Sequence, residues 1–310
     1  MKHFTKPFVE LTILFILLQT LAFTNTVAVT ITEGSVSITP TVFSPDGNGL
    51  NDTVSISFDS PDQGPLYLNI FYNTTQLVRS DLLMTKTGNT FRATWNGKND
   101  AGNYVSNDGL YTIRVSDTLG SGSGTAIGTV TVDTVGPTNP TLSIDGGETY
   151  ATSRNVTLTI SATGATYMKI SNYANFSDAS WETYVTTKSW QLLPGDGTKT
   201  VYINFRDEAG ATSSTSDTII LDTTLPTPSL TINNGASVTN NATVTLSITA
   251  SGATYMKIDN DTNFANMTTW IPKSDSYTFT IPNTDGVHTV YLKVKDDAGN
   301  TKITSDSITL

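Results

Sequence analysis

The stretch TGATYMKISNYANF, residues 163–176, returns as SGATYMKIDNDTNF at residues 251–264. The similarity extends without a gap to the whole of residues 140–176 and 228–264, and it resumes at TVYINFRDEAG, from Thr200, and TVYLKVKDDAG, from Thr289. A repeat of roughly 88 residues is too long for a solenoid unit and matches one complete small domain. The chain is therefore expected to be a string of modules, an architecture that favours reach, display or adhesion over catalysis.

Apolar and polar residues alternate within both copies of the repeat. The alternation is clearest in residues 200–206, 243–250 and 289–295, and it predicts antiparallel strands with one face in a core and one face in water. About seven short strands, separated by Gly, Asn and Asp turns, predict an immunoglobulin-like sandwich. The expected fold class is all-β: three tandem immunoglobulin-like β-sandwiches after an N-terminal signal peptide.

Two proline-containing linkers set the expected module boundaries. DTVGPTNP occupies residues 133–140 and DTTLPTP occupies residues 222–228. Because proline fixes φ and disfavours helix before it, both linkers should be short and semi-rigid. The expected organisation is a signal peptide at 1–28, a first module at 29–135, and two immunoglobulin-like repeats at 136–224 and 225–310.

The N-terminus is typical of a secretory signal. Lys2, His3 and Lys6 precede an apolar run from Leu11 to Leu18, which is too short to span a bilayer comfortably. The mature chain should therefore be secreted or exposed at the cell surface. An uncleaved membrane anchor is the rival interpretation, and it would be the only contact with a membrane.

The charge balance argues against a nucleic-acid partner. The chain has 17 basic and 27 acidic residues, a net charge of −10, and no evident Lys/Arg cluster along the sequence. An acidic surface repels phosphate backbones. The chain has no cysteine, so its modules must be held together by their cores alone.

An Asp-Ala-Gly motif recurs in all three modules. It stands at residues 207–210, 297–300 and 100–103. Asp starts a turn by accepting bonds from its own backbone, and Gly supplies the positive φ that a bulged hairpin needs. The motif is therefore expected to be a structural turn.

The first module is not a copy of the repeat, and two of its segments resemble a known family. TVFSPDGNGLNDTVSISF and TWNGKNDAGNYVSNDGLYTIRV, both within residues 36–133, are similar to the immunoglobulin-like domain of the flagellar hook-capping protein FlgD. At positions 46 and 48 this chain has Asp and Asn, where the family has Asn and Asp. Hook capping is not implied, because it needs other regions of FlgD. The matching residues are Phe43, Ser44, Pro45, Gly47, Gly49, Asn51, Asp52, Trp95, Gly97, Gly102, Gly109 and Tyr111.

The later modules resemble the immunoglobulin-like repeats of bacterial and archaeal surface proteins, which often end in a DGxxTVYxxxxDxAGN block. That block spans residues 285–300 and, with Ala211 at the final Asn position, residues 196–211. The resemblance implies display, adhesion or cell-wall association. The expected partner is a cell-surface or extracellular polymer or protein.

The best candidate cation site is the loop DGNGLND. Side-chain oxygens at alternate positions around glycines can wrap calcium, although the bidentate Glu of a helix-loop-helix calcium loop is missing. Asp100 or Asp108 would have to complete the shell. A weaker and separate possibility is that the linker residues Asp133 and Asp222 bind calcium between modules and stiffen the chain. The alternative is an Asx-rich turn stabilised by its own hydrogen bonds. The candidate ligands are Asp46, Asn48, Asn51 and Asp52.

Four aromatic residues suggest a glycan-binding site: Trp181 and Tyr167 in the first repeat, and Trp270 and Tyr255 in the second. Each tyrosine precedes a methionine in an alternating strand, so the tyrosines should point outward. The alternative is that these rings cover the edge of a sandwich or contact the neighbouring module.

Catalysis finds no support in the residues. His3 lies in the signal and His288 stands alone, so no Ser-His-Asp or metal-histidine set can be assembled. The function expected is a secreted, structural, display or adhesive surface protein that is not an enzyme and requires no cofactor, with calcium as the single cofactor suggested. Two alternatives stay open: a carbohydrate-binding accessory chain, and the non-catalytic part of a larger extracellular hydrolase.

Overall fold

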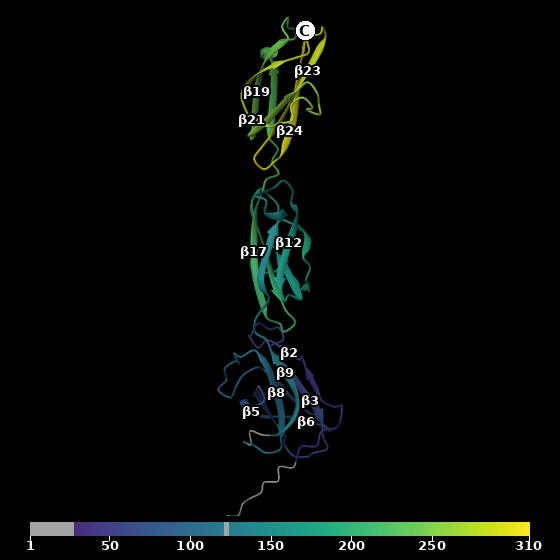
Figure 1. Cartoon of the computed structure of the whole chain (residues 1–310), viewed down its shortest axis with the longest axis vertical. Coiled ribbons are helices and arrows are strands. Elements are labelled where there is room, and N and C mark those ends of the chain that lie inside the picture. The colour runs from purple at the N-terminus through teal and green to yellow at the C-terminus, as the bar shows by residue number, and fades with distance from the viewer. Residues whose placement is uncertain (1–27, 121–123) are drawn as a thin grey trace, which may run out of the picture.

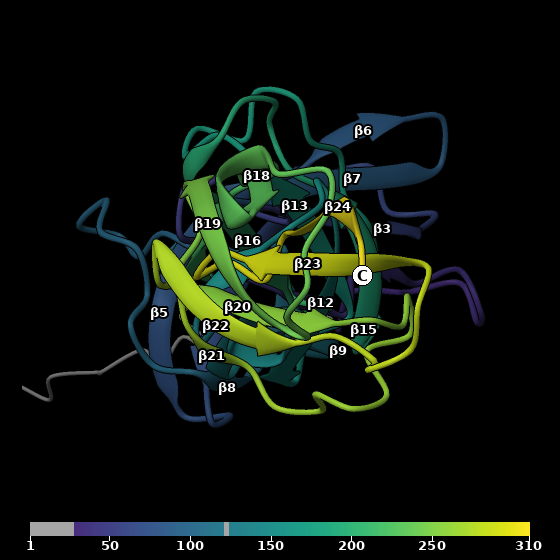
Figure 2. The ribbon, with the colours of Figure 1, turned by 90° about the horizontal axis from the view of Figure 1, so that it is seen from above.

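A computed structural model describes residues 28–120 and 124–310 as three β-sandwiches stacked end to end along one axis (Figure 1). The expected signal peptide lies outside the described residues, apart from its last residue. Figure 2 looks down the stack and shows the strands of the modules crossing at different angles. Within the described ranges, no helix is long and apolar enough to cross a membrane.

The first module has two sheets that share their first strand. Pro40 interrupts that strand, so that β1 pairs with β3 in one sheet while β2 pairs in parallel with β9 in the other. The first sheet has the order β1 (Ser37–Thr39), β3 (Val54–Asp59), β7 (Thr90–Trp95), β6 (Thr85–Thr87). The second has the order β2 (Val42–Phe43), β9 (Thr125–Val132), β8 (Gly109–Ser116), β4 (Tyr67–Tyr72), β5 (Gln76–Leu83).

The second module repeats this arrangement. Its smaller sheet has the order β10 (Thr138–Ile144), β12 (Asn155–Thr163), β15 (Thr187–Gln191). Its larger sheet has the order β11 (Tyr150–Ala151), β17 (Thr212–Leu221), β16 (Gly197–Arg206), β13 (Tyr167–Ser171), β14 (Glu182–Thr183). A single 3-10 turn, η1 (Asp145–Gly147), joins β10 to the segment that leads into β11.

The third module has the same topology. Its sheets have the orders β18 (Thr227–Ile232), β19 (Thr243–Ser251), β22 (Ser276–Thr280), and β21 (Ile271–Pro272), β20 (Tyr255–Asp259), β23 (Val287–Lys295), β24 (Thr301–Thr309). The turn η2 (Asn233–Gly235) corresponds to η1, and a parallel bridge from Val238 to Thr309 takes the place of β11. The all-β, tandem immunoglobulin-like fold is thus confirmed, and the first module shares its strand order with the repeats although it is no copy of them.

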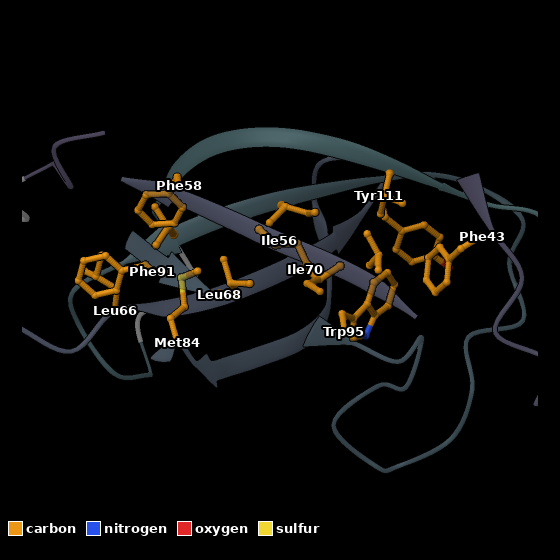
Figure 3. Packing of buried hydrophobic residues seen from close by; sticks show 14 of the residues in the cluster. Phe43, Ile56, Phe58, Leu66, Leu68, Ile70, Met84, Phe91, Trp95 and Tyr111 are labelled. Carbon is orange, nitrogen blue, oxygen red and sulfur yellow. The ribbon is translucent and has the colours of Figure 1, made fainter. Parts of the chain in front are cut away.

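Each sandwich is held by a separate core of residues from both sheets. In the first module, Figure 3 shows Phe43, Trp95 and Tyr111 gathered at one end of the core. The Phe43 and Trp95 rings are 5.3 Å apart edge to face, and Trp95 and Tyr111 are 5.4 Å apart. The Tyr111 hydroxyl donates to the Asn107 carbonyl at 2.8 Å, the corner arrangement of immunoglobulin-like domains. Burial, with Tyr72 and Asp108 nearby, raises the pKa of Tyr111 to about 12.

The duplicated strand alternates as the sequence predicts. Met168 and Met256 are 0% exposed and belong to the two repeat cores, whereas Tyr167 and Tyr255 are each 37% exposed. The predicted outward direction of the tyrosines is therefore confirmed, and it places them on the outer face of the larger sheet in each repeat.

Candidate functional sites

The loop 46–52 connects β2 to β3 and is stabilised by its own side chains. Asp52 accepts the Gly47 and Gly49 amides at 2.7 and 2.6 Å, while Asp46 accepts both the backbone and side-chain nitrogens of Asn48 at 3.0 and 2.8 Å. Burial and the charge of Asp52 together raise the pKa of Asp46, although the bond from the Asn48 amide opposes them. The carboxylates are thus used as they are in Asx turns, which is the alternative to a cation site.

The same loop is the contact between the first and second modules. Asn48 Nδ2 donates to the Gly210 carbonyl and Asn51 Nδ2 donates to the Glu208 carbonyl, both at 3.1 Å. A Cβ atom on Gly210 would lie 2.4 Å from the Leu50 carbonyl oxygen, so the two backbones touch there. Gly210 has a φ of 102°, in the region that favours glycine. The loop 46–52 and the hairpin 207–211 therefore form a fitted first joint.

The linker of the first joint is also fixed. Thr134 donates its amide and hydroxyl to Asp108 at 2.9 and 2.7 Å. A Cβ atom on Gly136 would lie 2.4 Å from the Thr212 carbonyl oxygen. Burial, and secondarily the negative charge of Asp133, raise the pKa of Asp207. A polar cavity of about 340 Å³ remains at this joint, lined by Pro40, Thr41, Asn51, Tyr167, Arg206 and Glu208 among others.

In the second joint the side-chain donor belongs to the later module, whereas in the first joint it belongs to the earlier one. Asn300, at the end of the third module's hairpin, donates its side-chain amide to the Asp222 carbonyl in the linker at 2.9 Å. The linker hydroxyls of Thr223 and Thr224 donate to Asp196 at 2.8 and 2.6 Å. Those bonds, the Thr224 hydroxyl first, lower the pKa of Asp196. Both linkers are thus anchored by an aspartate that precedes a strand of the module before them.

The Asp-Ala-Gly motif forms hairpin turns, but the residue that holds the turn differs from the expected one in two modules. In the second module Asp207 accepts the Gly210 and Ala211 amides, as predicted. In the third module the corresponding acceptor is Asp296, which precedes the predicted Asp297. In the first module it is Asn99, which accepts the amides of residues 101 and 103. In these two modules the predicted motif begins one residue after the side chain that holds the turn. The turn needs its acceptor three residues before the glycine, and the predicted Asp stands only two residues before it.

The predicted cation ligands Asp46, Asn48, Asn51 and Asp52 lie together in one loop. Of the two carboxylates expected to complete a shell, Asp100 instead accepts the amide and hydroxyl of Ser80 on β5, and Asp108 binds the linker. Across the described ranges, no three His, Cys, Asp or Glu side chains are grouped to hold a metal ion. Calcium at this loop stays a prediction.

The predicted glycan-contact residues are brought together within each repeat by basic side chains. In the first repeat the Arg206 guanidinium lies 4.5 Å from the Tyr167 ring centre and 4.8 Å from that of Trp181. In the second repeat Lys295 Nζ lies 5.1 Å from Tyr255 and 4.9 Å from Trp270. Both pairs occupy the outer face of the larger sheet. The cations were missed by the sequence analysis, because they come from a strand about 40 residues away from the tyrosines.

Residues 260–270, which end in Trp270, are held by a buried carboxylate. Asp259 is 1% exposed and accepts the backbone and side-chain nitrogens of Asn266, both at 2.8 Å, and the Met267 amide at 3.2 Å. Burial alone would raise the pKa of Asp259, but the bonds from Asn266 outweigh it and lower the pKa. Beside this segment, a groove of about 590 Å³ is lined by Ile258, Asn260, Tyr277 and Phe279 among others.

Comparisons with known proteins add the fold alone. No protein-family model and no curated protein matches the chain. Among solved structures, the fibronectin(III)-like modules of CbhA from Clostridium thermocellum align at 12% identity, covering 55% of this chain and 94% of theirs, with a TM-score of 0.37. The FN1-FN3 domains of chicken CNTN1 align at 10% identity over 89% of this chain and 98% of theirs, with a TM-score of 0.35.

A bacterial ice-binding adhesin of 1.5 MDa, in a structure that concerns host cell surface retention, aligns at 18% identity. The alignment covers 92% of this chain and 98% of the adhesin structure, with a TM-score of 0.36. At these identities and TM-scores the similarity reaches no further than strings of β-sandwich modules.

Proposed function

We propose that this chain is a secreted, non-catalytic surface protein whose three modules form a stiff spacer for display or adhesion. The observation that carries the proposal is the construction of the two joints. Each is closed by a hydrogen bond between a side-chain amide and a backbone carbonyl of the neighbouring module, and each linker is anchored to an aspartate. Joints held in this way suit a spacer, because they restrict how each module can turn against the next.

The side chains are also consistent with a role without catalysis. Within the described ranges many of the acidic groups, such as Asp52, Asp207 and Asp296, lie in turns, where they accept backbone amides, and His288 is the one histidine, bonded to the Thr284 carbonyl. Small sandwiches in series offer little enclosed volume for a substrate. We infer that the FlgD-like similarity of the first module describes a joint-forming sandwich and carries no hook-capping role.

Small-angle X-ray scattering of the secreted chain tests the spacer. We expect a single extended form whose maximum dimension matches three modules in series and does not change with salt. A broad distribution that includes compact forms would contradict stiff joints. Protease shaving of intact cells, followed by peptide detection, tests the location. We expect peptides from the three modules in the shaved fraction or in the medium, and absence from both would overturn the surface role.

A carbohydrate-binding role is the second candidate, because Trp181 and Trp270 occupy equivalent places on the outer sheet faces of the two repeats. Retention on an insoluble polysaccharide, lost on Trp181→Ala or Trp270→Ala, would support it. A purely structural spacer would show no retention.

A further inference from the structure

We propose that the outer face of β20 and β23 in the third module binds an acidic polysaccharide, with Trp270 as the surface on which a sugar ring stacks. We call this surface the basic aromatic face and define it by Tyr255, Lys257, Trp270, Lys293 and Lys295. The inference rests on the proposed surface role for its biological setting, but the binding itself can be measured on the purified chain.

Three ammonium groups lie over one indole ring on this face. Lys257 Nζ lies 5.1 Å from the Trp270 ring centre, Lys293 Nζ 5.9 Å and Lys295 Nζ 4.9 Å. Strand pairing explains the cluster, because Lys257 on β20 is directly opposite Lys293 on β23, and Lys295 is opposite Tyr255. Cations within about 6 Å of an aromatic ring centre are attracted to its face.

Among the residues that the structure describes, the positive charge of this face has no ion-pair partner. Ion pairs among the described residues join Arg79 to Asp100, Lys188 to Glu182 and Lys273 to Asp275, and none involves the three lysines of the face.

The acids nearest to the face along its own strands are already engaged or lie in the hairpin. Asp259 follows Lys257 on β20, but its oxygens accept nitrogens of Asn266 and Met267. Asp296 follows Lys295, but it accepts the amides of its own turn. Asp297 is exposed in that hairpin. Asp259 keeps its negative charge, because the nitrogens that it binds are neutral, but among the described residues the three lysines form no ion pair. Their cluster is thus complementary to an anion that binds at this point.

The combination of groups selects the class of ligand. An aromatic ring offers a flat apolar surface to the C–H face of a pyranose, and the ammonium groups around it can neutralise a carboxylate on that sugar. A polyphosphate would gain from the lysines but has no apolar face to place on the indole. The overall negative charge of the protein opposes extended contact with a polyanion, so only a short stretch of the polysaccharide should bind, and binding should weaken as salt rises.

The first repeat offers an incomplete copy of the same surface. Trp181 contacts Lys169 at 4.9 Å and Arg206 at 4.8 Å, but Asn204 stands opposite Lys169 where the second repeat has a lysine. Tyr167 and Arg206 also line the cavity of the first joint. We therefore expect the third module to be the stronger site.

The test is the affinity of the full secreted chain for polygalacturonate, measured by calorimetry at low and physiological salt. Neutral dextran, polyphosphate and single-stranded DNA are the comparison ligands. The variants are Trp270→Ala and the double change Lys293→Gln with Lys295→Gln. The control is Lys302→Gln, an exposed lysine on β24 that pairs with buried Val294 and so projects to the opposite side of the sheet. Circular dichroism melts verify that each variant is folded.

We expect the double lysine change to weaken binding of polygalacturonate about 2- to 30-fold, since exposed ion pairs contribute roughly 0.2–1 kcal/mol each. Trp270→Ala should weaken it about 2- to 12-fold, Trp181→Ala, made for comparison, should weaken it less, and Lys302→Gln not at all. If Trp270→Ala destabilises its loop, the lysine variant still decides the question, because it leaves the core unchanged.

Three outcomes overturn the proposal. These are no binding of polygalacturonate at low salt, equal binding of dextran, and binding of polyphosphate or DNA at least as tight as that of polygalacturonate and unaffected by Trp270→Ala. Failure here with a positive shaving experiment would remove this site and leave the surface role intact. Binding together with a failed shaving experiment would remove the surface role and leave the binding site intact.

Discussion

Replacing Gly210 by alanine should open the first joint. The new Cβ atom would lie 2.4 Å from the Leu50 carbonyl oxygen, against an ordinary contact of at least 3.4 Å. Relief needs a movement of about 1 Å, which would stretch the bonds from Asn48 and Asn51 from 3.1 Å to about 4 Å, beyond hydrogen-bond range. Losing two such bonds costs about 1–3 kcal/mol, so the population of the open joint should rise roughly 5- to 150-fold.

The chain supplies a matched control at Gly299. This glycine occupies the same hairpin position in the third module and has a φ of 100°, against 102° for Gly210, but no atom lies within 4 Å of the position its Cβ would take. Alanine at either site carries the same backbone strain, about 1–2 kcal/mol. Only Gly210→Ala adds the collision between modules.

Hydrogen exchange followed by mass spectrometry separates the two effects. With Gly210→Ala, peptides that cover residues 46–52 should exchange faster, and scattering should show a broader range of shapes. With Gly299→Ala, exchange should change only in the hairpin 296–300. If the two variants leave residues 46–52 equally protected, or broaden the scattering equally, the reasoning about the first joint is wrong.

The remaining predictions concern single ionisable groups and the loop 46–52. Tyr111→Phe should cost about 1–2 kcal/mol of unfolding free energy in urea. Because the folded pKa of Tyr111 is raised to about 12, its contribution is complete below the ordinary pKa and is lost as pH rises through 12. Asp259→Asn should cost about 2–4 kcal/mol, since an amide cannot accept all the bonds made to the carboxylate. The lowered pKa of Asp259 means that its contribution is present above the ordinary pKa and is lost as pH falls through the folded value, which an acid titration of the third module measures. For Asp207 the sign is opposite: its raised pKa means that folding is favoured while it is protonated and that this is lost as pH rises through the folded pKa. Asp207→Asn, which keeps the acceptor oxygen and removes the repulsion from Asp133, should be at least as stable as the parent at pH 7 in a thermal melt. Calcium in millimolar amounts should raise the melting temperature of the first module if the loop binds it, and an unchanged melt would reject calcium there.

Much of the fold follows from the sequence, because alternation and turn chemistry are local. The step from Tyr255 to Met256 already separates an exposed side chain from one in the core. The prolines of the two linkers stand where one sandwich ends and the next begins. The shared topology of the first module was not visible, because a strand order is set by which strands pair and not by the residues within one strand.

The joint contacts and the basic aromatic face could not be predicted in the same way. Lys257 and Lys293 belong to strands 36 positions apart, and only the register of β20 on β23 makes them neighbours. In the sequence each lysine is a single charge in an acidic chain. The sequence therefore shows no cluster of basic residues, although the fold brings three of them together. The loop 46–52 was recognised as unusual, but the acceptors of its two asparagines are carbonyls in another module.

The loop 46–52 of the first module compensates for a difference between the hairpins of the two repeats. The hairpin of the third module ends in Asn300, whose amide reaches down to the linker before it. The hairpin of the second module ends in Ala211, which has no side-chain amide, and there the donors are Asn48 and Asn51 of the first module instead. Each joint thus has a side-chain amide donor, which belongs to the later module in the second joint and to the earlier module in the first joint. The first module thus supplies the side-chain amides for a hairpin that lacks the asparagine.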